Sequence, residues 1–421
     1  LRAWPLSRLK WRPGGSNINL VKAHNLRVVL LTLLNEPSLS RVQLARRTRL
    51  SNTTITNLVA ELIDQGIVSE ESASPTSGKE IRPVGRPRTG IHLEPGARFV
   101  VGVHIGVGKF RVAIANLRCE IQYKQEHQFD ITLPAPKVLA QIVLCIEDTI
   151  AASQVARDRI LGVGVGASGL IDFQSGINVL APNLNWRNVP LKEYLCAALN
   201  MPVVVDNNAR VMALGESNFG AGRDVNSLVF VYGRIGVGAG LTFQGQVYRG
   251  SSMGAGEIGH TIMLLQGGEP CRCGNSGCLE TLVSEVAILR QAEQIARLNT
   301  DGILAQTMRE RQDLDPIEQV FTSARQGDEA TCRLLAERAY YLGVALVNLV
   351  NLYNPELILL GGIFAQGQDF FVEPVRNMVR ECSFGGMGKG VRVQASSYAW
   401  KAGVVGAAAL ALMTFLYHSE S

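Results

Sequence analysis

The stretch Gly256-Glu257-Ile258-Gly259-His260-Thr261, with Cys271-Arg272-Cys273-Gly274-Asn275-Ser276-Gly277-Cys278-Leu279-Glu280 after it, is the most distinctive chemical pattern in this sequence. It places one imidazole and three thiolates close together along the chain, from His260, Cys271, Cys273 and Cys278. This ligand set suits tetrahedral Zn2+, and four protein ligands leave no open position, so the pattern predicts a structural zinc ion. A reduced, metal-free cysteine cluster is the alternative.

The sequence on both sides of this motif predicts an α/β domain with a partly parallel sheet. Long β-branched runs that end in glycines alternate with helical stretches. The runs are 99–106, 160–169, 203–205 and 357–360, and a hairpin is expected over 228–243. The pair Gly361-Gly362 after the last run either turns beside a nucleotide or simply ends the strand.

Composition indicates a soluble globular protein of two or three domains, because 47% of the 421 residues are apolar and 18% are charged. Disordered and fibrous classes are excluded. The longest weakly polar stretch, 403–417, is short for the roughly 20 residues of a membrane span and is expected to be a buried C-terminal helix. No secretory signal is apparent, so a cytoplasmic location without membrane attachment is expected.

Charge is distributed unevenly, which indicates a module for a polyanion at one end of the chain. Residues 1–92 contain 14 Lys and Arg against 6 Asp and Glu, whereas residues 93–421 contain 27 against 30. A solubilising basic tail would have the same composition.

The basic end has the pattern of a winged helix-turn-helix. Apolar residues recur with helical spacing over 18–34 and predict a first helix. Ser40 and Gln43 predict a capping box for a second helix, and Ser51 is a suitable N-cap for a third. Ile55, Leu58, Val59 and Leu62 form the expected buried stripe of that third helix. A small scaffolding bundle is the alternative.

Polar and basic side chains on this module are candidates for DNA contacts. Amide and hydroxyl groups at the start of the third helix could read base edges; they belong to Asn52, Thr53, Thr54, Thr56 and Asn57. Guanidinium groups could meet phosphates; they belong to Arg41, Arg46, Arg47 and Arg49. A β-hairpin wing should present Arg86 and Arg88 to a minor groove, although the Arg-Pro segment could instead be a solvated loop.

These motifs together resemble the ROK family of repressors, open reading frames and sugar kinases. The resemblance covers nearly the whole chain and is most specific at 256–260 and 271–280. Further matches in the same domain are residues 181–186, 206–209, 213–216 and 354–356, the last of these before Gly361-Gly362. In the basic module, Ser40-Arg41-Val42-Gln43-Leu44-Ala45 resembles a helix of the repressor branch.

The resemblance implies an actin-like, hexokinase-like fold of two lobes and a sugar site. We therefore expect a DNA-binding domain over 1–92 and a ROK domain over 97–421, with lobes 97–205 (plus the C-terminal helix) and 206–400. The sugar contacts implied are Gly169, Asn207, Asn208, Glu257, His260 and Glu280. Because His260 is also a zinc ligand, one ring nitrogen would bind the metal and the other would face the sugar.

The sequence departs from the family's kinases at three places. Asn208 stands where they have an Asp general base, and an amide cannot accept the proton of the attacking hydroxyl. The first phosphate loop has His104 instead of Asp, and the second has Ile235 instead of Thr. We therefore expect a sugar-responsive regulator, as a repressor of carbohydrate-utilisation genes, without kinase activity.

Two other functions compete with this expectation. One is an active sugar kinase with an appended DNA-binding domain. The other is a regulator controlled by a protein partner, with a sugar site that no longer functions. The presence of Asn207, Glu257, His260 and Glu280 argues against this second alternative. The expected partners are operator DNA, a sugar and a second copy of the chain, as a homodimer or a dimer of dimers.

Overall fold

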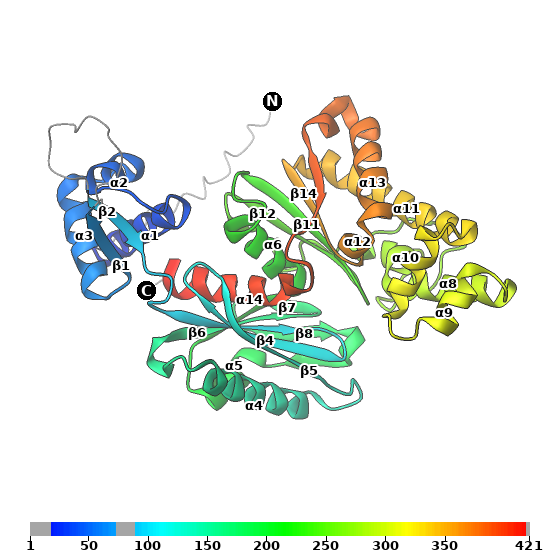
Figure 1. The fold of residues 1–421 in the computed structure, drawn as a ribbon, viewed down its shortest axis with the longest axis horizontal. Coiled ribbons are helices and arrows are strands. Elements are labelled where there is room, and N and C mark those ends of the chain that lie inside the picture. The colour runs from blue at the N-terminus through cyan, green and yellow to red at the C-terminus, as the bar shows by residue number, and fades with distance from the viewer. Residues whose placement is uncertain (1–17, 73–88, 418–421) are drawn as a thin grey trace, which may run out of the picture. The chain divides into compact units, whose positions relative to one another are not determined.

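The computed structural model describes residues 18–72 and 89–417, which form two compact units (Figure 1). The first unit is Leu1–Pro95 with Met413–Ser421, and the second is Gly96–Leu412.

Three helices form the core of the first unit: α1 (Ile18–Asn35), α2 (Arg41–Thr48) and α3 (Asn52–Asp64). Ser40 makes the predicted capping box with Gln43, and Ser51 accepts a hydrogen bond from the Thr54 N–H at 3.0 Å. The predicted stripe of α3 is fully or almost fully buried. The helix-turn-helix expectation is therefore confirmed, including both N-caps.

Two strands complete the winged module. β1 (Val68–Ser72) pairs in antiparallel register with β2 (Thr89–Leu93), and Leu39 forms a bridge with Ile91 of β2. Residues 73–88 between the strands, with Arg86 and Arg88, lie outside the described residues. Within the same unit, the short helix Met413–Tyr417 packs against α1.

Two five-stranded sheets of the same plan organise the second unit. In each, an antiparallel group of three strands is followed by two strands that run parallel to the first strand of the group. The first sheet has the order β10 (Val203–Asn207), β6 (Ile160–Ala167), β3 (Phe99–Ile105), β4 (Lys109–Asn116), β5 (Ile121–Gln128). The second has the order β13 (Gln246–Val247), β12 (Val237–Phe243), β11 (Ser227–Gly233), β14 (Leu357–Gly362), β15 (Arg392–Ala395).

Two helices lie between the sheets. α14 (Ala402–Leu412) packs on β3 and β6, α6 (Asn208–Phe219) packs on β11 and β12, and the two helices cross each other. Small residues allow this crossing: a Cβ atom on Gly406 would lie 2.4 Å from the Val211 carbonyl oxygen. The two lobes are therefore joined through a close helix–helix contact.

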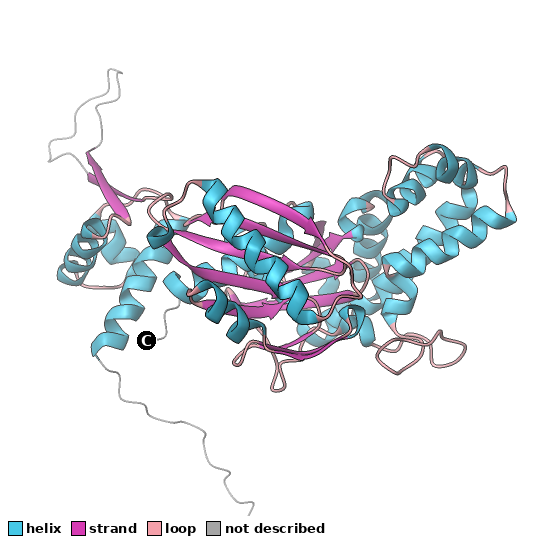
Figure 2. Cartoon of the chain, turned by 90° about the horizontal axis from the view of Figure 1, so that it is seen from below, coloured by secondary structure: helices cyan, strands magenta, loops and turns pink. Residues whose placement is uncertain are grey.

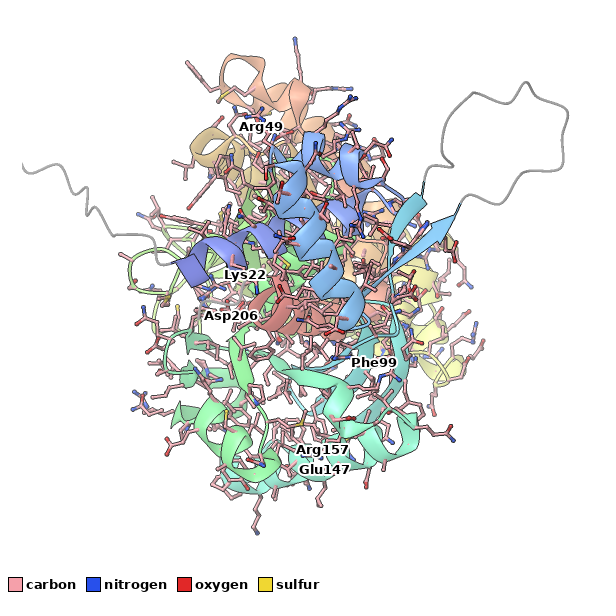
Figure 3. All side chains as sticks on the ribbon, turned by 90° about the vertical axis from the view of Figure 1, so that its left-hand side faces the viewer. Lys22, Arg49, Phe99, Glu147, Arg157 and Asp206 are labelled. Atoms are coloured by element: carbon pink, nitrogen blue, oxygen red, sulfur yellow. The ribbon has the colours of Figure 1, made fainter. Side chains whose placement is uncertain are left out.

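Helices also cover the outer faces of the sheets, as Figure 2 shows for the strands at the centre of this unit. α4 (Ala135–Ser153) and α5 (Leu191–Leu199) belong to the first lobe, where Arg157 and Glu147 form an ion pair of 2.6 Å (Figure 3). A small sheet follows, of β7 (Leu170–Asp172), β8 (Ile177–Ala181) and β9 (Trp186–Val189). The second lobe has α7 (Leu279–Val283), α8 (Glu285–Leu298), α9 (Ile303–Glu310), α10 (Pro316–Arg325), α11 (Glu329–Tyr353), α12 (Ile363–Gln366) and α13 (Gln368–Cys382).

The C-terminal apolar segment is a core helix, as expected. All residues of α14 are buried. The longer segment Ala399–Tyr417 has the length and composition of a membrane span, but 67% of its most apolar window is buried inside the protein. Burial against the sheet and α6 accounts for its composition without a membrane.

Candidate functional site

A cavity of about 350 Å³ lies between the two lobes of the second unit, and we call it the central cavity. Its walls come from the ends of β3, β6 and β10, the first residues of α6, the β11–β12 turn and the segment around η3 (Ile258–His260). The six predicted sugar residues all line it: Gly169, Asn207, Asn208, Glu257, His260 and Glu280. The fold thus brings together residues that are far apart in the sequence.

Asn207 and Asn208 occupy the junction between β10 and α6. Asn207 caps α6, since its Oδ1 accepts from the Ala209 N–H at 2.9 Å, and its Nδ2 donates to the Gly169 carbonyl at 2.8 Å. Asn208 is buried, and its Nδ2 donates to the Ile105 carbonyl and the Ser168 hydroxyl, both at 3.0 Å. The buried Asn208 Oδ1 has no protein partner. A donor on a ligand would satisfy it.

Glu280 connects the central cavity to the second sheet. Its Oε2 accepts from the Val237 N–H at 2.9 Å, which fixes the carboxylate beside the β11–β12 turn. Glu257 directly precedes η3 and is accessible to solvent. The fixed carboxylate of Glu280 and the accessible carboxylate of Glu257 can both accept hydrogen bonds from vicinal hydroxyls.

The predicted metal ligands converge on one point. The ligand atoms of His260, Cys271, Cys273 and Cys278 all lie within 4.8 Å of one another. His260 Nδ1 is 3.6 Å from Cys271 Sγ, and Cys273 Sγ is 3.7 Å from Cys278 Sγ. Tetrahedral Zn2+ would require about 3.6 Å between nitrogen and sulfur and about 3.8 Å between sulfurs, from its usual bond lengths. The residues therefore fit the ion.

The same geometry assigns different roles to the two ring nitrogens of His260. Nδ1 points to the thiolates, which leaves Nε2 for a ligand in the central cavity. The histidine can thus belong to both sites, as its place in both motifs requires.

A buried ion-pair network behind the cavity was not anticipated from the sequence. Asp206, fully buried at the end of β10, pairs with Arg210 at 3.0 Å and with Arg249 at 2.8 Å (Figure 3 labels Asp206). Arg210 also donates to the Met253 carbonyl, and Arg249 lies 3.7 Å from the centre of the Phe173 ring. The network ties the 249–253 loop to the strand that carries Asn207.

Cationic residues in the cavity wall were also missed. Lys109, Arg111, Arg234 and Arg272 all line the central cavity. His104 stands among them, and burial together with Arg111, Arg234 and Lys109 lowers the pKa of His104 to about 3. Alternation along β4 could have revealed that Lys109 and Arg111 share one face.

The predicted DNA contacts are partly available. Asn52, Thr53, Thr56 and Asn57 are exposed on α3, whereas Thr54 is half-buried and its hydroxyl bonds to Ser51 at 2.8 Å. Arg46 and Arg49 are exposed, and Figure 3 labels Arg49. Arg49 follows α2 in a left-handed conformation. Arg41 is paired with Glu70 at 2.7 Å, and Arg47 with Glu36 at 3.1 Å. Arg41 and Arg47 could contact a phosphate only if these ion pairs opened, or if the guanidinium group bound the carboxylate and the phosphate together.

Family models identify both units. Residues 100–414 match the model of the ROK family, and residues 24–69 match the model described as winged helix-turn-helix DNA-binding. This chain belongs to the ROK family. The expectation from the sequence motifs is therefore confirmed for the family, the fold and the winged module.

Relatives of this ROK protein include regulators and kinases. It is 30% identical to the xylose repressor of Caldicellulosiruptor bescii over 96% of this chain and 99% of the relative. A solved ROK family transcriptional regulator, a homologue of the E. coli MLC protein, matches with a TM-score of 0.80 and 28% identity over 94% of this chain and 97% of that one. A ROK family glucokinase from Streptomyces griseus, solved with glucose and AMPPNP, matches with a TM-score of 0.67 and 28% identity over 75% and 100% of the two chains.

Proposed function

We propose that this ROK protein is a DNA-binding transcription regulator that responds to a sugar and represses genes of carbohydrate use. The observation that carries the proposal is the presence in one chain of a capped helix-turn-helix and a cavity lined by the six predicted sugar residues. The winged module supplies a surface for DNA, and the cavity supplies hydrogen-bonding groups for hydroxyls.

Three residues that line the cavity support a function without kinase chemistry: Asn208, His104 and Ile235. A general base must accept a proton from the attacking hydroxyl, and Asn208 is an amide whose Nδ2 is held by two acceptors. His104 and Ile235 stand in the two loops where a carboxylate and a hydroxyl would organise Mg2+ and phosphate. A sugar can bind here without being phosphorylated, so we propose that the ROK domain is a sensor.

The test combines two measurements on the purified full-length chain. A coupled assay of ATP consumption with a panel of hexoses and pentoses should detect no sugar-dependent turnover, and calorimetry should detect binding of at least one sugar. Turnover at the rate of an ordinary enzyme would support the rival function, an active kinase with an appended DNA-binding domain.

We propose Zn2+ as the occupant of the His/Cys cluster, with a structural role. It would hold the segment between Glu257 and Glu280, so that both carboxylates face the same cavity.

For DNA, we propose that Asn52, Thr53, Thr56 and Asn57 read bases and that Arg46 and Arg49 contact phosphates, with Arg41, Arg47, Arg86 and Arg88 as further phosphate or groove contacts.

A single helix-turn-helix covers one half-site, so we propose that two copies of the chain bind an inverted repeat. Thr54 is a further proposed base contact, although its hydroxyl and its N–H both bond to Ser51, the N-cap of α3, so a base would have to share the Thr54 hydroxyl with Ser51.

A further inference from the structure

Four cationic side chains line the central cavity against two carboxylates, Glu257 and Glu280. Three of the cations lie around His104. In the antiparallel ladder, His104 is directly opposite Arg111, and Lys109 lies two residues from Arg111 on the same face of β4. Arg234 reaches the same region from the β11–β12 turn.

These cations are only partly neutralised by protein carboxylates. Glu126 pairs with Arg111 and, at 3.8 Å, with Lys109, so one carboxylate faces two cations. Arg234 contacts Glu285 at 3.4 Å. Neither Glu126 nor Glu285 lines the central cavity. Arg111 binds Glu126 through its Nε, so its Nη donors can serve a ligand.

A second observation, independent of the cations, concerns the buried His104 ring. The ring is 4% exposed and lines the central cavity, yet neither of its nitrogens has a hydrogen-bond partner. The fold makes room for this ring: a Cβ on Gly403 of α14 would lie 2.4 Å from it. A buried polar group without a partner is costly, and a ligand acceptor would satisfy the ring N–H.

We propose that the central cavity binds an anionic sugar, one bearing a phosphate or carboxylate group, and that His104, Arg111 and Arg234 receive this group. The inference rests on the proposed function, since it specifies the class of sugar that the sensor detects. The neutral His104 ring donates one N–H, and the guanidinium groups offer paired donors that match the oxygens of either anion. The hydroxyls of the same ligand face Glu257, Glu280 and Asn208.

Calorimetry on the full-length chain tests this with matched ligands. The neutral members are glucose, galactose, mannose and xylose; the anionic members are the 6-phosphates of the three hexoses and the three corresponding uronates. At least one anionic member should bind about tenfold or more tightly than its parent, as expected for a charge-assisted hydrogen bond gained. The phosphate and uronate arms distinguish the two anions, and inorganic phosphate alone measures binding of the charge without the sugar.

Variants locate the contact. Arg234→Met and Arg111→Met should each remove most of the difference between the anionic ligand and its parent, and Arg234→Lys should retain part of it. Arg333→Met is the matched control, because Arg333 is exposed on α11 and does not line the cavity. Thermal unfolding of each variant checks that the fold is intact.

The outcomes separate the two proposals. A neutral sugar that binds as tightly as its phosphate and uronate would overturn the anionic inference and leave the sensor function standing. An anionic preference unaffected by both Met variants would also overturn it. If no sugar of either kind binds, the proposed function fails and the inference fails with it.

Discussion

The orientation of the Asn208 side chain amide in the central cavity is fixed by its hydrogen bonds. Its Nδ2 faces a backbone carbonyl, which is only an acceptor, so the orientation of the amide follows from its contacts. The residue type was evident from the sequence. The direction of the amide was not, because it depends on Ile105 and Ser168, which come from two other strands or their ends.

We expect Asn208→Asp to destabilise the protein without creating a kinase. One carboxylate oxygen would lie against the Ile105 carbonyl, so the pKa of the new side chain would be raised by repulsion and burial. The loss should be about 1–3 kcal/mol in the free energy of unfolding near neutral pH. Because the folded pKa is raised, the penalty should be absent below the unfolded pKa of about 3.9 and should grow as the pH rises above it.

Denaturant unfolding at pH 5 and pH 8 measures this effect. Asn377→Asp is the control, because Asn377 is exposed within α13 and should show no comparable penalty. Equal stability of Asn208→Asp and the parent at pH 8 would contradict the assigned amide contacts.

At the scale of elements, local signals located the helices of the winged module well. The capping residues Ser40 and Ser51 and the stripe of α3 depend on neighbours in the sequence, so they could be predicted. The order of the strands and the crossing of α6 with α14 depend on pairing between distant segments. Periodicity does not carry that information. Alternation along β4 shows that Lys109 and Arg111 share a face, but their place beside His104 and Arg234 depends on such distant pairing.

The N-cap of α3 gives a prediction for this element. Ser51→Ala removes the hydrogen bond to the Thr54 N–H and should cost the winged module about 1 kcal/mol of stability. Operator affinity should fall as well, because the exposed residues Asn52 and Thr53 lie in the turn that would fray. Ser51→Asn retains an N-cap and is the control. Hydrogen exchange of the α3 amides and DNA titration measure the two effects, and unchanged exchange would contradict the role of the cap.

The metal-binding segment gives a second prediction at this scale. Elemental analysis of freshly purified protein should find about one zinc ion per chain. Cys273→Ser should lower the zinc content and weaken sugar binding, because the segment from Glu257 to Glu280 loses its anchor. Cys382→Ser should change neither, since Cys382 is exposed and outside the cluster. Full sugar affinity in a zinc-free Cys273→Ser protein would refute the structural role.

For the whole molecule, the question is how a sugar in one unit can affect DNA binding by another. The described chain connects the units twice: once after β2, and once where α14 continues into Met413–Tyr417, which packs against α1. Because α14 also packs against α6 of the other lobe, we expect a ligand that changes this contact to act on the second connection. A ligand can shift such an equilibrium only by the difference in its affinity for the two arrangements.

The last prediction follows from this condition. If the sugar lowers the affinity for operator DNA by some factor, saturating operator DNA must lower the affinity for the sugar by the same factor, because the coupling free energy belongs to the pair of sites. Calorimetric titration of the sugar into the free protein and into the operator complex measures one side, and DNA titration with and without sugar measures the other. Glu280→Ala is the control: it should weaken sugar binding and leave operator affinity unchanged in the absence of sugar. Identical sugar affinity with and without the operator would contradict the allosteric account, and the ROK domain would then act on transcription by another route, such as a protein partner.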